Sequence, residues 1–461
     1  MTLVAGIDSS TQSTKVVLCQ AEDGTVVGTG SAPHPAGTEC DPQAWWAALE
    51  QAGSGLLDRA AAVAVAGQQH GMLVLDADGA VIRPALLWND LRSSAAAADL
   101  VAEFGGAQWW AEQTGSVPRA SFTVSKLRWL VQHEPVNARR VARVMLPHDW
   151  LTWRLGAADP VTDRGDASGT GYFATSAGCW LPYVAKAALG HEPLLPRVAG
   201  PSEIVGETEH GALLAAGTGD NMAAALGLGL APGEVAVSIG TSGTAFAVSR
   251  APAVDPSGAV AGFADATGRF LPLVCTVNAG LVLSAVATMT GTDLAGLSQR
   301  ALSAEPGAGG VSLLPYFDGE RTPDRPLATG AMAGLTTTNA TPQNLARAAV
   351  EAVLASLADA ADLLAAHGVE RRRVLLIGGA ARSQAVRKLA PGMFGQEVLA
   401  PEAQEYVALG AARQAAWALT GTPEPPAWPR PASETYRGAP QPHLRERYAA
   451  LRDATMPLDT L

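Results

Sequence analysis

Two stretches half a chain apart share one pattern of apolar and polar positions. Residues 4–18 read Val-Ala-Gly-Ile-Asp-Ser-Ser-Thr-Gln-Ser-Thr-Lys-Val-Val-Leu, and residues 235–248 read Val-Ala-Val-Ser-Ile-Gly-Thr-Ser-Gly-Thr-Ala-Phe-Ala-Val. Each consists of an apolar run, a turn of small polar residues and a second apolar run, which predicts a β-hairpin. The tip threonines, Thr11 and Thr241, lie 230 positions apart. This spacing predicts two similarly built domains in succession.

The C-terminal half alternates between helical and strand patterns. Thr341 and Pro342 mark the start of a helix that we expect to end at Gly368. The following pattern predicts a buried strand at 374–377, a turn at 378–383, a helix to Phe394, a short strand at 396–399 and a helix at 407–419. Strands that alternate with helices indicate α/β layers.

The predicted domain boundaries follow the order of the chain. We expect an N-terminal domain at 1–229 and a C-terminal domain at 233–425, followed by a proline-rich tail at 426–461 that is packed on the surface or partly mobile. The residues between the two domains, Gly-Leu-Gly-Leu-Ala-Pro-Gly at 227–233, suit a hinge and equally an ordinary loop.

Composition narrows the class of protein. The 461 residues are 48% apolar and carry a net charge of −11. An acidic chain without a basic stripe is a poor partner for nucleic acid. Four scattered cysteines without a Cys-x-x-Cys pair argue against a zinc ribbon or a disulfide framework. We expect no signal peptide and no membrane span, and therefore a cytoplasmic protein.

Several common catalytic signatures are absent from the sequence. None of the four lysines follows a glycine, so there is no Gly-Lys-Ser/Thr phosphate loop. The patterns GxSxG, HExxH and GxGxxG are also missing. The sequence therefore lacks the usual motifs of hydrolase triads, zinc proteases and simple dinucleotide-binding proteins.

The hairpin tips and one further loop carry the candidate chemistry. Backbone N–H groups and hydroxyls of such tips can bind phosphate oxygens, and Asp8 at a strand end suits a Mg²⁺ ligand. The loop Gly-Thr-Gly-Asp-Asn-Met at 217–222 presents Asp220 before an alanine-rich stretch. Asp220 could cap a helix, or act as the base that takes a proton from a hydroxyl attacking phosphorus.

The ordered set of motifs resembles the FGGY family of carbohydrate kinases over residues 2–420, and within it the xylulokinases. The motifs that carry the resemblance are Gly-Gln-Gln-His-Gly at 67–71, Leu-Trp-Asn-Asp-Leu-Arg at 87–92, Leu-Pro-His-Asp-Trp at 146–150, Thr-Asp-Arg-Gly-Asp-Ala-Ser-Gly-Thr at 162–170, Gly-Thr-Gly-Asp-Asn at 217–221, the signature at 313–323 and Gly-Gly-Ala-Ala-Arg-Ser at 378–383. The departure is Gln69, where the family usually has methionine.

The resemblance implies two actin-like, ribonuclease-H-like α/β domains with an interdomain active-site cleft. It implies phosphorylation of D-xylulose to D-xylulose 5-phosphate with ATP and Mg²⁺, Asp220 being the general base and Asp8 the metal ligand. The implied sugar-binding residues are Gln69, His70, Trp88 and Asn221. The implied ATP-binding residues are Ser10, Thr11, Lys15, Gly240, Thr241, Ser242, Gly378, Gly379 and Ala380.

Three alternatives stay open on the sequence. The sugar could instead be ribulose, gluconate or a related polyol, or the chain could be a non-catalytic sugar or nucleotide sensor on the same fold. The assembly is also open, and a homodimer is one candidate. At Gln69 we expect the backbone to contact the sugar, so that Gln69→Met leaves specificity unchanged while His70→Ala raises KM.

Overall fold

The computed structural model describes residues 1–460, which form two compact units. The first unit comprises residues 1–230, 249–271 and 405–430, and the second comprises 231–248, 272–404 and 431–460. The contacts therefore divide the chain differently from the predicted boundaries 1–229, 233–425 and 426–461. Residues 405–425 belong to the first unit because the helix they contain packs on the first sheet, which sequence order alone does not reveal.

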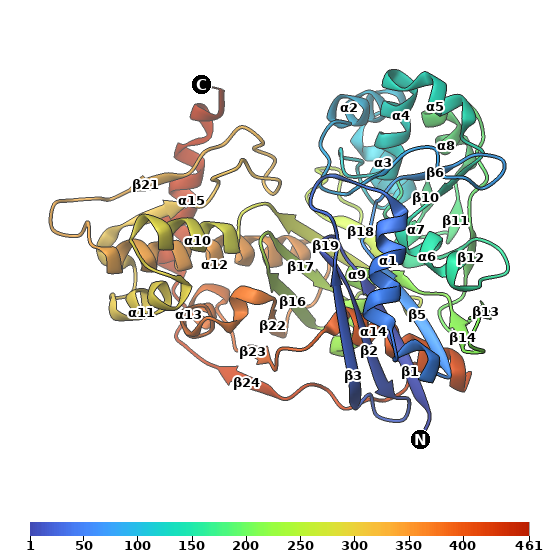
Figure 1. The fold of residues 1–461 in the computed structure, drawn as a ribbon. Coiled ribbons are helices and arrows are strands. Elements are labelled where there is room, and N and C mark those ends of the chain that lie inside the picture. The colour runs from blue at the N-terminus through green and yellow to red at the C-terminus, as the bar shows by residue number, and fades with distance from the viewer. Residues whose placement is uncertain (461) are drawn as a thin grey trace. The chain divides into compact units, whose positions relative to one another are not determined.

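The first unit is built on a mixed sheet, seen in Figure 1 with its first strands in blue. Its strand order is β13-β14-β5-β1-β2-β3, and β15 also pairs with β5. The strands are β1 (Leu3–Ser9), β2 (Ser13–Gln20), β3 (Val26–Pro33), β5 (Ala62–Gly67), β13 (Ile204–Glu207), β14 (Leu213–Ala215) and β15 (Thr218–Gly219). Strands β1 and β2 form the predicted first hairpin, with Asp8 opposite Lys15.

Alternating side chains of β1 enter two separate cores. Ala5 and Ile7 pack on one face with α1 (Pro42–Gly53) and α6 (Pro147–Leu155), where the large buried residues Trp45 and Trp150 lie. On the other face, Val4 packs against alanines of α9 (Asp220–Leu228) and α14 (Tyr406–Thr420). The small side chains let α14 approach the sheet closely.

Glycines mark the points of closest approach around α14. A Cβ on Gly6 of β1 would lie 1.9 Å from the carbonyl oxygen of Ala408, and one on Gly410 would lie 1.8 Å from that of Ala223. These contacts are shorter than any side chain tolerates, so the sequence needs glycine at both positions.

Smaller elements complete the first unit. Its other strands are β4 (Glu39–Cys40), β6 (Leu73–Leu75), β7 (Ala85–Leu86), β8 (Arg143–Met145), β9 (Val161–Asp163), β10 (Phe173–Ala174), β11 (Cys179–Trp180), β12 (Arg197–Ala199) and β18 (Ala261–Ala264). Its other helices are α2 (Ser94–Glu103), α3 (Ala107–Thr114), α4 (Thr123–His133), α5 (Pro135–Arg140), α7 (Arg164–Ala167) and α8 (Pro182–Leu189).

The sheet of the second unit repeats the strand order of the first. Its strands run β19-β17-β16-β22-β23-β24, where the first sheet has β3-β2-β1-β5-β14. They are β16 (Glu234–Ile239), β17 (Gly243–Ala247), β19 (Phe270–Thr276, in this unit from Pro272), β22 (Arg373–Ile377), β23 (Val398–Pro401) and β24 (Ser433–Tyr436). An antiparallel meander followed by parallel strands in both sheets confirms the predicted repeat and the ribonuclease-H-like fold.

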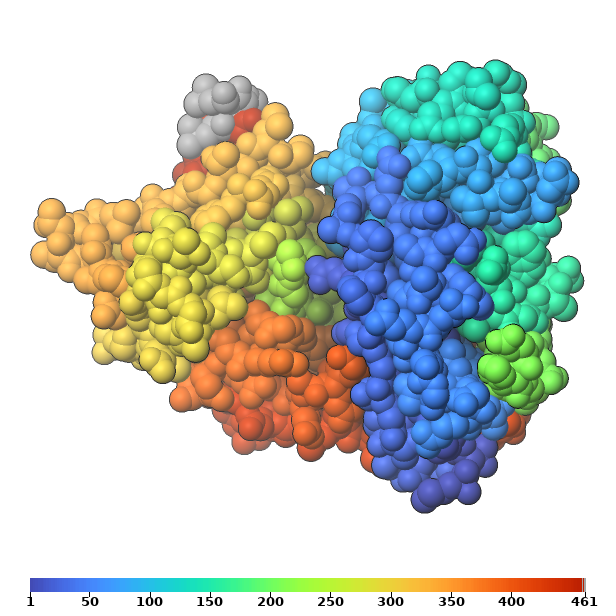
Figure 2. Space-filling model, viewed as in Figure 1, coloured from blue at the N-terminus to red at the C-terminus, as the bar shows by residue number. Residues whose placement is uncertain are grey.

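Helices α10 to α13 and α15 belong to the second unit. They are α10 (Gly280–Met289), α11 (Leu294–Ser303), α12 (Pro342–Ala366), α13 (Gln384–Phe394) and α15 (Pro442–Ala454), and the hairpin strands β20 (Ser312–Leu314) and β21 (Ala331–Ala333) lie between α11 and α12. The hydroxyl of Thr341 accepts a hydrogen bond from the Asn344 amide, which confirms the predicted start of α12. The gold segment around β21 stands out from the rest of this unit in Figure 2.

Two predicted elements differ in place or extent. The short strand expected at 396–399 is β23 at Val398–Pro401, and the tail expected to be a surface segment contains β24 and α15. In the described residues, no single helix is both long and apolar enough to cross a membrane. Helices α10 and α11 reach that length and apolarity only as a pair bent by 83°.

Candidate active site

Three candidate segments follow neighbouring parallel strands of the first unit. Asp8 lies at the end of β1, Gln69 and His70 follow β5, and Asp220 follows β15. Both Asp8 and Thr218 are paired with Ala66 of β5, so the three strands end at the same level. The carboxyl ends of adjacent parallel strands are the usual place for a ligand in an α/β sheet.

The Asp8 carboxylate is buried at this edge. It is 5% exposed, and the Ser10 hydroxyl donates a hydrogen bond to its Oδ1. Burial raises the pKa of Asp8 to about 6, against the opposing effects of the Ser10 hydrogen bond and the Lys15 charge. A nearby cation stabilises the ionised form of a buried carboxylate of this kind.

Asp220 occupies the first position of α9, and Gly219 precedes it as the N-cap. The carboxylate therefore does not fill the capping role that was its alternative interpretation, although its Oδ1 accepts hydrogen bonds from the Asn221 backbone and side-chain nitrogens at 2.7 and 2.9 Å. Burial, and next the charge of Asp8, raise the pKa of Asp220 to about 7. A carboxylate with that pKa accepts a proton readily near neutral pH.

Asn221 connects the Asp220 carboxylate to Gln69. Its Nδ2 donates to Asp220 Oδ1 and to Gln69 Oε1, each at 2.9 Å. A carboxylate can only accept, so the Asn221 side chain must present its NH₂ group to Asp220 and therefore the same group to Gln69. Gln69 consequently turns its oxygen toward Asn221. Its Nε2 is buried and has no hydrogen-bond partner in the described chain.

His70 is held from its backbone and from its ring. It has a positive φ of 66°, and its carbonyl oxygen accepts hydrogen bonds from Lys126 Nζ at 2.8 Å and Thr123 Oγ1 at 3.2 Å. Its Nδ1 donates to the Gly169 carbonyl at 2.6 Å. A non-glycine residue in the left-handed region is strained, and these bonds compensate for the strain.

Two further predicted residues of this unit have protein partners. Trp88 Nε1 donates to Thr11 Oγ1 at 2.7 Å, which joins a predicted sugar contact to a predicted phosphate contact. Lys15 Nζ forms an ion pair with Glu405 at 2.6 Å. A phosphate that binds Lys15 would have to compete with this carboxylate.

In the second unit, the predicted phosphate and nucleoside residues meet at one edge of the sheet. Residues 240–242 follow β16 and residues 378–380 follow β22, and these strands are parallel with Ser238 opposite Ile377. Gly378 has a φ of 89°, and a Cβ there would lie 2.8 Å from the backbone of Ile239. The turn at 378–380 therefore begins in contact with the end of β16, from which residues 240–242 follow.

The second hairpin tip is exposed and rests on α10. Thr241 is exposed, and the carbonyl oxygens of Gly240 and Thr241 accept hydrogen bonds from the Gly280 and Leu281 amides at 2.9 and 3.3 Å. A Cβ on Gly280 would come within 2.4 Å of the Gly240 oxygen. The contact fixes the tip against the helix.

Two residues that support this site were not predicted. Lys126 of α4 is completely buried and holds the His70 carbonyl, and Gly169 holds the His70 ring. The available sequence signal for the first was a single lysine among the uncharged residues at 123–127, all of which the structure buries. Gly169 lies inside the motif at 162–170, but that motif did not indicate a contact with His70.

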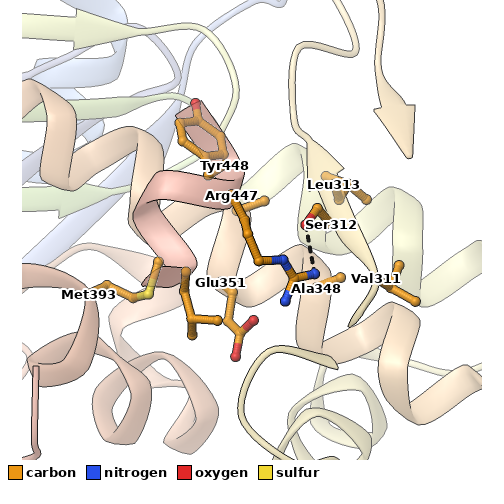
Figure 3. Close-up of a pocket in the computed structure, with 10 residues that line it drawn as sticks. Val311, Ser312, Leu313, Ala348, Glu351, Met393, Arg447 and Tyr448 are labelled. Atoms are coloured by element: carbon orange, nitrogen blue, oxygen red, sulfur yellow. Dashed lines mark hydrogen bonds between the residues drawn. The ribbon is translucent and has the colours of Figure 1, made fainter. Parts of the chain in front are cut away.

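A small cavity of the second unit involves none of the predicted residues. It has a volume of about 20 Å³, room for about one water, and lies between β20, α12, α13 and α15 (Figure 3). Its charged groups are paired: Arg447 Nη2 donates to Ser312 Oγ at 2.9 Å, and Glu351 accepts from Arg347 Nε at 2.6 Å. The cavity is too small and too well paired for a substrate.

Comparisons with known proteins match both units. The N-terminal domain of the FGGY family of carbohydrate kinases matches residues 3–229, and its C-terminal domain matches residues 235–419. A xylulose kinase from Streptomyces coelicolor is 49% identical over 91% of this chain and 88% of its own length. One from Streptomyces rubiginosus is 47% identical with the same coverage.

A solved structure agrees with this assignment. The crystal structure of xylulose kinase from Bifidobacterium adolescentis has 44% sequence identity and a TM-score of 0.90, and the match covers 98% of this chain and 99% of that one. These matches establish that the chain belongs to the FGGY family of carbohydrate kinases and is an ATP-dependent sugar kinase.

Proposed function

We propose that this chain transfers the γ-phosphoryl group of ATP to D-xylulose and forms D-xylulose 5-phosphate. The similarity to xylulose kinases over most of the chain supports the sugar. The observation that carries the mechanism is that Asp8 and Asp220 follow β1 and β15, the strands on either side of β5, with Asn221 bonded to both Asp220 and Gln69.

Asp220 is the general base in this proposal. Its Oδ1 is occupied by Asn221, which leaves Oδ2 to accept the proton of the attacking sugar hydroxyl. The raised pKa of about 7 makes the carboxylate a better proton acceptor than an ordinary aspartate. Phosphoryl transfer depends mostly on positioning and charge stabilisation, so the hydrogen bonds that fix Asp220 are part of the catalytic design.

Gln69, His70, Trp88 and Asn221 bind the sugar in this proposal. Gln69 Nε2 is a buried donor with no acceptor in the described chain, and a sugar hydroxyl or carbonyl oxygen would supply one. The phosphates are bound by Ser10, Thr11 and Lys15 of the first unit and Gly240, Thr241 and Ser242 of the second. Gly378, Gly379 and Ala380 lie against the nucleoside.

Asp8 is the proposed Mg²⁺ ligand. The residues fit this ion, because burial raises the pKa of Asp8, burial and the charge of Asp8 raise that of Asp220, and Mg²⁺ prefers one or two carboxylates with its remaining waters. The ion would neutralise charge on the transferred phosphate. Asp8→Ala should therefore raise the Mg²⁺ concentration needed for half-maximal activity by more than tenfold and leave sugar binding, measured by calorimetry, intact. An unchanged Mg²⁺ requirement would make Asp8 a structural residue.

A panel of sugars tests the proposed substrate. Initial rates of ATP consumption are measured by a coupled assay with D-xylulose, D-ribulose, D-gluconate, glycerol and no sugar. We expect D-xylulose to give the highest kcat/KM by at least tenfold. If ribulose or gluconate equals it, the family assignment stands and the proposed sugar is wrong.

The same protein is expected to act in the cytoplasm. The four cysteines are scattered along the sequence without a Cys-x-x-Cys pair, a pattern more typical of a reducing compartment than of a disulfide framework. Fractionation of cells that express the tagged chain tests this expectation. Kinase activity recovered in the membrane or an exported fraction would contradict it.

A further inference from the structure

His148 is a buried imidazole that no proposed reaction step uses. It is the second residue of α6 and is completely buried. Its Nε2 lies 2.8 Å from the Ala216 carbonyl oxygen, and its Nδ1 lies 3.1 Å from Asp149 Oδ1 and 3.2 Å from Asp166 Oδ2. The Ala216 carbonyl can only accept, so Nε2 carries a proton, and beside an ionised Asp149 or Asp166 Nδ1 carries one as well, which makes the ring an imidazolium.

The charge of this imidazolium is balanced by its neighbours. Burial disfavours the charged ring, but the hydrogen bonds and charges of Asp149 and Asp166 outweigh burial and hold the pKa of His148 well above its usual range. Asp149 Oδ2 also accepts from the Leu146 amide at 2.8 Å, which anchors that carboxylate to the start of α6.

The ring is wedged between two segments of the candidate active site. A Cβ on Gly217 would lie 2.5 Å from His148 Nε2, and a Cβ on Gly67 would lie 2.8 Å from His148 Cβ. Gly67 is followed by Gln69 and His70, whereas Gly217 leads directly to Asp220. One side chain therefore touches the roots of both the proposed sugar loop and the proposed base loop.

The partner helix of His148 contacts the same two segments. The carboxylate of Asp163, which caps α7, accepts from the Thr218 hydroxyl at 2.8 Å, and the Gly169 carbonyl beyond that helix accepts from the His70 ring. Gln414 of α14 donates to the Gly217 carbonyl at 3.1 Å. The loop that ends at Asp220 is thus held at three successive residues, and His148 provides the hold on Ala216.

We propose that His148 is a positioning residue which, as a buried cation between Asp149 and Asp166, fixes the backbone at Ala216 and thereby sets the place of Asp220 relative to Gln69 and His70. This inference rests on the proposed roles of those three residues. Misplacement of a reacting group by about 1 Å is enough to lower a rate by about a hundredfold.

The same three side chains could in principle bind a metal ion, since their ligand atoms lie within 4.8 Å of one another. The geometry favours a hydrogen bond instead, because Nδ1 lies 3.2 Å from Asp166 Oδ2. The cluster is also closed to solvent, with each of the three residues at most 1% exposed. Metal analysis of the purified protein distinguishes the two.

Three variants test the proposal, each assayed with the sugar that the wild type turns over fastest. His148→Gln removes the charge, and His148→Lys keeps a cation with three donors for the three acceptors. His191→Gln is the matched control, because His191 Nε2 also contacts a backbone carbonyl, that of Val141 at 2.7 Å, elsewhere in the first unit. The double variant His148→Gln/Asp166→Asn removes a buried charge of each sign, in case the single variant fails to fold.

We expect His148→Gln, or the double variant in its place, to lower kcat by about 10- to 100-fold with KM for ATP changed less than twofold. His148→Lys should recover kcat to within about fivefold of wild type, and His191→Gln should match wild type. Amide hydrogen exchange at residues 216–221 should speed up at least tenfold in the Gln variant and return toward wild type in the Lys variant. The hydrogen-exchange measurement does not depend on turnover, so it tests this inference even if the proposed sugar or base is wrong.

Three results would overturn the proposal. The first is a folded His148→Gln or double variant with wild-type kcat and wild-type exchange at 216–221. The second is a folded His148→Lys variant as slow as the Gln variant. The third is one metal ion per chain whose removal reproduces the loss of kcat.

Discussion

At the scale of single residues, the environment of Asp220 makes opposite demands on stability and activity. Burial and the Asp8 charge disfavour the ionised carboxylate, yet the proposed reaction needs that form. Active sites commonly carry such a cost, and removing the charge then stabilises the fold while it abolishes function. Asp220 is therefore a residue at which stability and turnover should move in opposite directions.

Asp220→Asn should stabilise the protein in a pH-dependent way. The pKa of Asp220 is raised from 3.8 to about 7 in the folded state, so the folded protein binds this proton more tightly than the unfolded chain does. Its contribution to stability is complete below about pH 4 and is lost as the pH rises through 7. At pH 8 the neutral asparagine should raise the free energy of unfolding by on the order of 2 kcal/mol, less than the full shift because the side chain is partly exposed.

Urea unfolding at pH 5 and pH 8 measures this difference. The gain of Asp220→Asn over wild type should be larger at pH 8 than at pH 5, and the exposed Asp58→Asn should show no such trend. A variant that is less stable than wild type at pH 8 would show that the Asp220 carboxylate is not destabilised by its surroundings.

Gln69 is the residue for which our proposal departs from the expectation of a backbone contact with the sugar. Asn221 binds the Gln69 oxygen and leaves Nε2 as a buried donor, so we propose that the side chain contacts the sugar. Gln69→Met, which cannot donate, should therefore lower kcat/KM for D-xylulose by about tenfold, the value of about one hydrogen bond. Steady-state kinetics with His70→Ala as the comparison measures it, and an unchanged kcat/KM in Gln69→Met would restore the backbone interpretation.

At the scale of elements, the sequence predicted those helices and strands whose formation depends on neighbouring residues. Both hairpins and the long helix α12 follow from the alternation of apolar residues, the small polar tips and the Thr341 cap, and the structure confirms them. The edge strand β24 was not predicted because it pairs with β23, some 35 residues earlier in the chain. The first unit likewise acquires α14 through packing that no local pattern encodes.

The residues of the candidate site also divide into those that local sequence indicates and those that only the fold brings together. Asp8 and Asp220 could be named from the sequence because each follows a strand and stands in a turn of small residues. The partners that fix the site come from distant parts of the chain: Lys126 and Gly169 reach His70 from 56 and 99 residues away, and His148 reaches Ala216 from 68. Such contacts exist only after the chain has folded.

The packing of α14 yields a prediction about the helix that carries Asp220. Gly410→Ala would place a methyl group 1.8 Å from the Ala223 carbonyl oxygen of α9, and backbone cannot move aside cheaply. We expect a loss of about 1–3 kcal/mol in unfolding free energy, the usual cost of overpacking. Gly200→Ala is the control, since its Cβ would meet its nearest neighbour, Glu203, at 3.7 Å. Equal melting temperatures for the two variants would contradict the close contact.

At the scale of the whole molecule, two units with one strand order carry different chemistry at corresponding strand ends. In the first unit these ends present carboxylates and amides, and in the second they present glycines, hydroxyls and backbone groups. The carboxylates and amides of the first set suit the proposed proton transfer and sugar binding, and the proposed phosphate residues come from both units.

The most direct test of this account is the rate of sugar phosphate formation by Asp220→Asn. Product is measured by mass spectrometry with saturating D-xylulose and Mg·ATP, beside wild type and Asp58→Asn, after circular dichroism has shown all three to be folded. The account predicts a rate lower by about 10²–10⁴-fold in Asp220→Asn, the usual contribution of a general base, and wild-type rates in the control. A rate within threefold of wild type in Asp220→Asn would contradict it.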